Sequence, residues 1–379
     1  MNFELSEEQR AIRDVARDFA AKEMAPYAAQ WDEDCTFPLD TLRKAAGLGL
    51  ATIFVAEDVG GTGLGRMEGA LIFEALAEGC ASTAAFLSIH NMAGSMIDTY
   101  GDQAQRKRWL PAMATMELIA SYCLTESSSG SDAADLTTRA KKDNGNYLMN
   151  GSKAFVSGGG ESDIYLVMCR TGGDGPKGIS CMIVEKGMKG LSFGARERKM
   201  GWNSQPTTAV NFDDCRVPVE NRLGDEGIGF KIAMQGLDGG RLNIGACSLG
   251  GAQFAFDTAL AYVKERKQFG KRIADFQATR FKLADMATEL EAARLLLYAA
   301  AVKVEEGAHD ATMAAAMAKR FATDIGFRVT NEALQLHGGY GYLKDYPIER
   351  ILRDLRVHQI LEGTNEIMRV VISKHLLKD

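Results

Sequence analysis

The sequence lacks the marks of a disulfide-stabilised or metal-binding protein. Its 7 cysteines are an odd number, and they are widely spaced, with no Cys-x-x-Cys pair and no histidine cluster near them. Neither a disulfide framework nor a zinc site is therefore indicated. We expect buried thiols in a reducing compartment and no bound metal.

Long apolar stretches are missing as well. No segment has the roughly 18 consecutive apolar residues that a membrane span needs, and the N-terminus has no basic region followed by an apolar one. We expect no membrane insertion and a cytoplasmic location. A mature mitochondrial matrix enzyme that had lost its transit peptide would share these features.

Positive charge is not in excess. The 44 Lys and Arg residues are outnumbered by 50 Asp and Glu residues, the formal net charge is -6, and the basic residues are scattered among acidic ones. Such a chain is poorly suited to neutralising a phosphate backbone, so we expect no nucleic-acid partner. With 379 residues, 46% hydrophobic and 25% charged, the composition is that of a globular protein with two or three domains.

Residues 1–118 are predicted to form an all-helical domain. Ser6, with Gln9 three residues later, has the pattern of a capping box at a helix start. Further helices are indicated from Pro38 to about Gly47, over 67–77 and over 83–100.

A glycine-rich loop at 60–65 follows the strand-like run 51–55 and invites comparison with a dinucleotide-binding motif. That motif needs a third glycine where Arg66 stands, and no acidic residue follows at the right distance. We interpret the loop as a structural turn between helices.

Residues 119–225 are predicted to form a middle antiparallel β-barrel domain. Short runs rich in β-branched and aromatic residues occur at 137–142, 147–157, 164–170, 179–186 and 207–212. Between two of them lies Asn144-Gly145, a strong hairpin signal. The runs do not alternate with long helices, which argues against a parallel doubly wound sheet.

Residues 226–379 are predicted to form a C-terminal four-helix bundle. Apolar residues recur there at helical spacing, as in the series Met286, Leu290, Ala293 and Leu297. Long helices joined by short polar loops are typical of a bundle. The predicted helices cover about 228–266, 276–306, 311–337, 347–361 and 364–377.

Glu362 lies in a break between two of these helices. Gly363 permits a sharp turn there, and Thr364 can cap the helix that follows. A carboxylate held in such a turn among apolar residues can act as a general base, since burial would raise its pKa toward neutral pH. On these residues alone, an ordinary solvated glutamate at a helix end is the alternative.

The β domain opens with a loop from Tyr122 to Asp132, rich in small hydroxyl residues and glycine, whose backbone N–H groups suit an anion or a flavin edge. Further along the chain stand, in this order, Phe155-Val156-Ser157, Arg266-Lys267-Gln268-Phe269-Gly270, Phe276-Gln277, Gln335-Leu336-His337-Gly338-Gly339 and Leu361-Glu362-Gly363-Thr364-Asn365-Glu366. With these motifs, the chain resembles the acyl-CoA dehydrogenase family over essentially its full length.

The resemblance implies an α+β fold of three domains that holds FAD, and a homotetramer built as a dimer of dimers. It implies α,β-dehydrogenation of a short branched acyl-CoA, with isobutyryl-CoA favoured as substrate. Glu362 would remove the α-proton, the β-hydrogen would leave as a hydride to flavin N5, and the electrons would pass to an electron-transferring flavoprotein. A butyryl-CoA dehydrogenase, an acyl-CoA oxidase of the same fold and a non-catalytic helical scaffold are the alternatives.

The resemblance also assigns contacts residue by residue. The residues implied to contact FAD are Tyr122, Cys123, Leu124, Thr125, Gly130, Ser131, Phe155, Val156, Ser157, Arg266, Gln268, Phe269, Phe276, Gln277, Gln335, Leu336, Gly338, Gly339, Thr364, Asn365 and Glu366. Those from Arg266 to Gly339 would include the set that reaches the FAD of a neighbouring subunit. The residues implied to contact the substrate are Ser131, Asp238, Gly239, Gly240, Arg241 and Gly363.

Two features depart from patterns common in the family, and one further position bears on the choice of the base. Ser127 and Ser128 replace a Pro-Gly pair, which predicts a less rigid loop. Phe155 stands where tryptophan is common and keeps a flat apolar face without the indole donor. Gly240 occupies the position where isovaleryl-type relatives carry their catalytic glutamate, which leaves Glu362 as the candidate base and makes room for a branched acyl group.

Asp238 and Arg241 lie one helical turn apart on this predicted helix. They are expected either near the substrate or in a simple ion pair.

Overall fold

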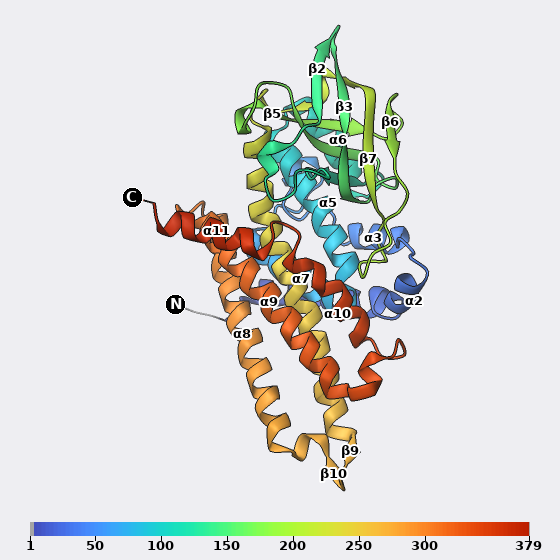
Figure 1. Ribbon diagram of the computed structural model, residues 1–379, viewed down its shortest axis with the longest axis vertical. Coiled ribbons are helices and arrows are strands. Elements are labelled where there is room, and N and C mark those ends of the chain that lie inside the picture. Colours follow the sequence, from blue (N-terminus) through green and yellow to red (C-terminus); the bar gives the residue numbers. More distant parts are fainter. Residues whose placement is uncertain (1–3, 379) are drawn as a thin grey trace.

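The computed structural model describes residues 4–378, with a β-sheet at one end of an elongated molecule and long helices at the other (Figure 1). The first part of the chain is helical, as predicted. The capping box at Ser6 is present, because the side chains of Ser6 and Gln9 each accept the other residue's backbone N–H. The main helices of this part are α1 (Glu7–Phe19), α2 (Ala28–Glu33), α3 (Leu39–Ala46), α4 (Arg66–Gly79), α5 (Ala81–Tyr100) and α6 (Gln103–Ala114).

The glycine-rich loop between α3 and α4 is a structural turn, as expected. The run 51–55 before it is made of turns and bends, so its strand-like appearance was misleading. Gly60 and Gly63 have φ of 91° and 61° there, in the left-handed region that glycine adopts without strain.

The middle of the chain forms an eight-stranded sheet in the strand order β6-β7-β3-β2-β4-β5-β8, with β1 beside β4. Most pairings are antiparallel, whereas β1 pairs with β4 in parallel and β2 meets β4 in parallel at a single position. The strands are β1 (Ala120–Cys123), β2 (Arg139–Asp143), β3 (Asn146–Ser157), β4 (Ile164–Arg170), β5 (Ile179–Glu185), β6 (Leu191–Phe193), β7 (Thr207–Pro218) and β8 (Arg222–Leu223).

The predicted hairpin between β2 and β3 turns at Asn144 and Gly145, which have φ of 45° and 82°. Both values suit the two-residue turn whose twist matches that of the flanking strands.

The last part of the chain is a bundle of long helices, also as predicted. Its elements are α7 (Gly229–Glu265), the short hairpin β9 (Lys267–Gln268) and β10 (Lys271–Arg272), α8 (Gln277–Glu305), α9 (Ala311–His337), α10 (Ile348–Arg356) and α11 (Asn365–Leu376). Within residues 4–378, no helix has both the length and the apolarity to cross a membrane.

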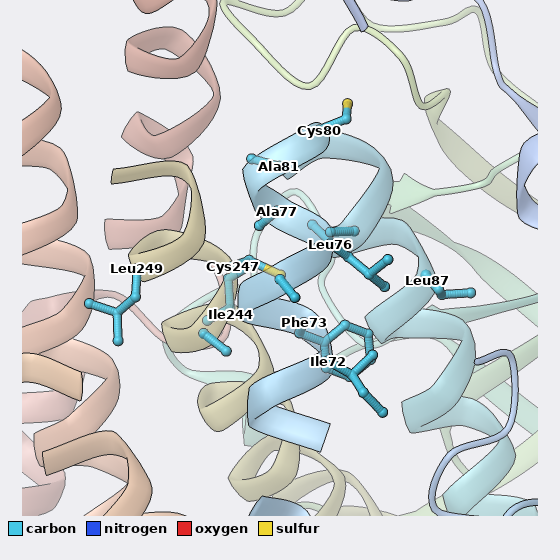
Figure 2. Packing of buried hydrophobic residues seen from close by; sticks show 14 of the residues in the cluster. Ile72, Phe73, Leu76, Ala77, Cys80, Ala81, Leu87, Ile244, Cys247 and Leu249 are labelled. Atoms are coloured by element: carbon cyan, nitrogen blue, oxygen red, sulfur yellow. The ribbon is translucent and has the colours of Figure 1, made fainter. Parts of the chain in front are cut away.

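Helix α7 runs through the largest hydrophobic core and packs between α4 and α9. Figure 2 shows Ile244 and Cys247 of α7 beside Phe73 of α4, while Leu249 points to the opposite side. The helices touch closely, because a Cβ at Gly250 would lie 2.0 Å from the carbonyl oxygen of Glu74. This contact fixes the N-terminal helices against the bundle.

The cysteines follow the prediction of buried thiols with one exception. Six of them are buried, and Cys35 is exposed after α2. Exposure was not predictable from its sequence neighbours.

Candidate active site

Glu362 sits on a strained turn between a short helix at Val357–Gln359 and α11. Its φ of 56° lies in the left-handed region that a residue with a side chain seldom adopts. Gly363 continues the turn with φ of 86°, and the Thr364 side chain accepts the N–H of Ile367 to cap α11. The predicted break, turn and cap are therefore all present.

The carboxyl group of Glu362 points into the protein. Its Oε2 is buried and has no hydrogen-bond partner in the part of the chain that the structure describes. It faces α7, because a Cβ built on Gly240 would lie 2.5 Å from this oxygen and 3.2 Å from the sulfur of Met92. Burial raises the pKa of Glu362 to about 7, against the opposing charges of Arg241 and Lys319.

Apolar sequence neighbours contribute less to this burial than we expected, since the side chain of Ile360 is largely exposed. The environment of the carboxyl group comes mainly from residues distant in sequence.

Arg241 and Asp238 form the simple ion pair that was one of the two arrangements expected from the sequence, with Nη1 and Oδ1 2.6 Å apart. Arg241 also donates through Nε to the carbonyl oxygen of Glu362, at 3.4 Å. The ion pair therefore lies directly beside the candidate base.

Tyr122, on strand β1 of the β domain, lies close enough to Glu362 for the charge of that carboxylate to act on it. Its hydroxyl group is buried and has no hydrogen-bond partner among residues 4–378. Burial and the negative charge of Glu362 raise the pKa of Tyr122 well above its ordinary value. Two polar side chains, from β1 and from the C-terminal turn, thus meet with unsatisfied hydrogen-bonding capacity.

His358 anchors the segment that precedes Glu362. Its Nε2 accepts from Nε1 of Trp202 at 3.1 Å, and its Nδ1 lies 2.6 Å from Oγ of Ser248 on α7. The ring is fully buried, which lowers the pKa of His358 to about 3. A neutral imidazole therefore ties this segment to both the β domain and the bundle.

The loop from Tyr122 to Asp132 is organised by a buried ion pair. Glu126 lies 2.8 Å from Nζ of Lys153 on β3, and both side chains are almost fully buried. The carboxylate also accepts the backbone N–H groups of Thr137 and Thr138. Burial favours the neutral acid, but the charge and hydrogen bond of Lys153 outweigh it and lower the pKa of Glu126 to about 2.

Hydrogen bonds within the loop hold the two ends of the segment that contains Ser127 and Ser128. Both serines are exposed, yet the loop ends are held, because Glu126 and Ser129 exchange backbone hydrogen bonds and Ser129 Oγ donates to the carbonyl oxygen of Asp132 at 2.6 Å.

The end of β3 offers the flat surface that a flavin ring would need. Phe155 is 67% exposed and has a φ of 57°, which turns an aromatic face outward. Val156 beside it is buried in the sheet, as are the side chains of Cys123 and Leu124, so these residues can offer only backbone atoms. Gly130 is open, with no atom within 4 Å of a Cβ built there. These features fit a bound FAD.

A second group of the predicted cofactor residues lies at the far end of the bundle. Helix α7 places Arg266 roughly 40 Å from Gly240, at 1.5 Å per residue, and Figure 1 shows β9 and β10 at the opposite end from the sheet. Phe269 is 92% exposed there, and no atom lies within 4 Å of a Cβ built on Gly338 or Gly339. This group comprises Arg266, Gln268, Phe269, Phe276, Gln277, Gln335, Leu336, Gly338 and Gly339.

One of two cavities lies close to Glu362 and Gly240, and the other does not. A small one of about 30 Å³ lies next to Met92 and is also lined by Arg66, Met96, Tyr100 and Gly236. A larger one of about 490 Å³ is lined by charged residues such as Asp32 and Arg353 and includes none of the predicted site residues. No group of three or more metal-ligating side chains occurs within residues 4–378.

Several residues at the site escaped the sequence reasoning. Lys319 on α9 is fully buried and donates to the carbonyl oxygen of Gly363 at 2.8 Å. Met92 and the Glu126–Lys153 pair were missed too. A lysine within an otherwise apolar helix face was the one signal that could have drawn attention to Lys319.

Comparison with known proteins covers all three parts of the chain. Family models match residues 6–117 (acyl-CoA dehydrogenase, N-terminal domain), 121–215 (middle domain) and 227–377 (C-terminal domain). The chain is 58% identical over 375 residues to bovine mitochondrial isobutyryl-CoA dehydrogenase, which covers 99% of this chain and 90% of that protein.

Solved structures agree with this. The fold matches butyryl-CoA dehydrogenase from Megasphaera elsdenii with a TM-score of 0.96 at 40% identity, over 100% of both chains. A chain from a structure described as the electron transferring flavoprotein of Acidaminococcus fermentans matches with a TM-score of 0.97 at 43% identity, again over 100% of both chains.

Proposed function

Because this chain belongs to the acyl-CoA dehydrogenase family and is an FAD-dependent oxidoreductase, we propose that it dehydrogenates a short branched acyl-CoA thioester with Glu362 as the base. Isobutyryl-CoA is the favoured substrate and methacrylyl-CoA the product. The observation that carries this proposal is the buried, unpartnered Oε2 of Glu362 facing Gly240.

The state of Glu362 suits proton abstraction. A carboxyl group with a pKa of about 7 is about half ionised at neutral pH, and its carboxylate is a stronger base than a solvated one. Its Oε2 has no hydrogen bond to give up before it accepts the α-proton. The strained backbone fixes the direction of the side chain.

The developing negative charge on the thioester oxygen needs hydrogen-bond donors in a dry site. The backbone N–H of Glu362 is one candidate, because it has no acceptor among residues 4–378. Bound FAD supplies the hydride acceptor for the β-hydrogen. We assign to FAD the backbone of residues 122–125, together with Thr125, Gly130, Ser131, Phe155 and Ser157. Thr364 and Glu366 would complete the site, with Asn365 contributing its backbone, because its side chain is buried against α9.

The small cavity beside Met92 supports a short acyl group, and the likeness to isobutyryl-CoA dehydrogenase supports a branched one. The absence of a side chain at Gly240 gives the carboxyl group of Glu362 its place against α7, and the cavity lined by Met92, Met96 and Tyr100 lies on the same side. We place Asp238, Gly239, Arg241 and Gly363 around the acyl group, because they lie beside Gly240 on α7 or beside Glu362. Butyryl-CoA remains the alternative substrate.

The far-end residues support a second copy of the chain as partner. Phe269 and the open glycines 338 and 339 lie at the end of the bundle that carries Arg266, which is roughly 40 Å along α7 from Gly240. This separation supports a role outside the cofactor site of their own subunit. We assign them to the FAD of a neighbouring subunit, within a homotetramer. An electron-transferring flavoprotein is the proposed electron acceptor, and use of oxygen instead would make the protein an oxidase. We place the enzyme in the cytoplasm or, as for the bovine relative, in a mitochondrion.

The test is anaerobic reduction of the purified yellow protein by a set of thioesters. We expect bleaching to be fastest with isobutyryl-CoA, compared with butyryl-, 2-methylbutyryl- and isovaleryl-CoA. Fastest reduction by butyryl-CoA would reject the branched substrate, and no reduction by any of them would reject the reaction. Turnover with oxygen alone, set against turnover with an electron-transferring flavoprotein, separates oxidase from dehydrogenase.

A further inference from the structure

We propose that Lys319 is a positioning residue for the base. Its buried ammonium group holds the turn that displays Glu362 and supplies a positive charge that favours the ionised carboxylate. This inference rests on the proposed role of Glu362, because Lys319 acts only through that side chain.

The position of Lys319 is unfavourable for a charged side chain, because burial removes its ammonium group from water. Lys319 is fully buried on α9, and a buried ammonium group must be compensated by hydrogen bonds or by opposite charge. Its Nζ donates to the carbonyl oxygen of Gly363 at 2.8 Å and to Oδ1 of Asn365 at 2.9 Å. Both acceptors belong to the turn that carries Glu362, and both are uncharged.

The partners of Lys319 are themselves fixed. Asn365 donates to Oγ1 of Thr323 at 2.9 Å and to Oδ1 of Asp324 at 2.7 Å, both on α9. On the other side of the turn, Arg241 donates to the carbonyl oxygen of Glu362. The carbonyl groups of residues 362 and 363 are thus each held by a cation, which stabilises the left-handed backbone that aims the carboxyl group at Gly240.

The ammonium group of Lys319 donates no hydrogen bond to a carboxylate in the described part of the chain. No ion pair of Lys319 occurs in the described part of the chain, and Glu362 supplies the strongest negative charge that acts on it. Burial lowers the pKa of Lys319 to about 8, so the group is mostly protonated at neutral pH. Its charge opposes the rise in the pKa of Glu362 that burial causes.

Other charged groups around the turn do not replace this one. Arg241 is already paired with Asp238, and His358 is neutral. Asp324, Glu366 and Tyr122 would, when ionised, add negative charge. Lys319 is therefore the cation in this group that lacks a bonded carboxylate.

The test measures the protonation of the Glu362 carboxyl group as a function of pH. In the FAD-bound enzyme, the carboxyl titration is read from infrared difference spectra of each protein minus the same protein carrying Glu362→Gln. In Lys319→Gln, which keeps donors but loses the charge, and in Lys319→Met, we expect the titration of Glu362 to move to higher pH by about one unit or more. Lys319→Arg should return it to within about half a unit of the wild type.

The pH profile of anaerobic flavin reduction should move in the same direction as the titration. Lys22→Met removes an exposed lysine on the first helical segment and serves as the matched control with no shift. A wild-type titration in both uncharged variants would overturn the inference, and so would loss of folding in both, because the role would then be structural only.

The result also separates this inference from the proposed function. Normal flavin reduction by Glu362→Gln alone would reject Glu362 as the base, whatever Lys319 does. Loss of reduction in Glu362→Gln with an unmoved titration in the Lys319 variants would reject only the role of Lys319.

Discussion

Two buried carboxylates in this molecule have opposite surroundings. Glu126 in the β domain is bonded to Lys153, Thr137 and Thr138, and its pKa falls to about 2. Glu362 in the C-terminal turn has one oxygen without any partner among residues 4–378, and its pKa rises to about 7. Burial alone therefore does not decide what a carboxylate does.

The difference lies in how each charge is compensated. Glu126 meets its lysine directly, and the pair joins the loop at residues 122–132 to β3 as a fixed part of the scaffold. Lys319, whose charge acts on Glu362, is turned instead toward a carbonyl and an amide oxygen. Its charge acts on Glu362 while the carboxyl oxygen remains free to take a proton.

The largest expected effect comes from removing the free carboxylate. Glu362→Gln should slow anaerobic flavin reduction by isobutyryl-CoA on the order of 10²-fold to 10⁴-fold, because an amide cannot accept the α-proton. Binding of FAD and acyl-CoA should persist. Stopped-flow absorbance measures the rate, and Glu8→Gln, an exposed position on α1, is the control. A rate within a few-fold of the wild type would remove the contrast between the two glutamates.

Breaking the compensated pair should affect stability instead. Lys153→Met leaves the Glu126 carboxylate buried without its charge partner and should cost about 3–5 kcal/mol in the free energy of unfolding. Urea denaturation followed by circular dichroism measures this loss. The double variant Lys153→Met, Glu126→Gln should recover part of it, because no uncompensated charge remains. Equal losses in the single and double variants would mean that the pair itself matters little.

The smallest effect concerns the pH dependence of stability. Since the pKa of Glu362 is raised in the folded state, the folded protein binds its proton more tightly, and this group makes the protein less stable as pH rises from about 4.5 to about 7. The lowered pKa of Glu126 acts in the opposite sense, because its stabilisation is lost as pH falls from about 4.5 toward 2.

Urea denaturation across these two pH windows should therefore separate the groups. Glu362→Gln should remove the decline between pH 4.5 and 7 and leave the acid-side loss unchanged. A decline of the same size in the wild type and the variant would show that other groups cause it.

Local patterns predicted most of the helical architecture. Apolar spacing and turn residues located α7 and α9 to within one or two residues, and the Gly363 turn and Thr364 cap were read directly from the sequence. The short strands β1, β6 and β8 were missed, because two to four residues carry too little periodicity and are held by pairing with distant strands.

The candidate site was predictable only in part, for a related reason. Glu362 stands in a recognisable motif, whereas Lys319 looks like one more lysine in a helix. Its burial depends on the packing of α9 against α7 and α11. The bond between Glu126 and Lys153 joins positions 27 residues apart through the fold of the sheet. Such relations arise from tertiary structure and leave no local pattern.

The contact between Gly240 and the Glu362 carboxyl group has an evolutionary consequence. A first side-chain carbon at position 240 would fall 2.5 Å from the oxygen of Glu362, so the two positions compete for one volume. A descendant that gained a side chain at position 240 would have to turn the carboxyl group of Glu362 away from its present place. A proton-accepting group moved onto α7 would therefore displace the one on the C-terminal turn instead of adding to it.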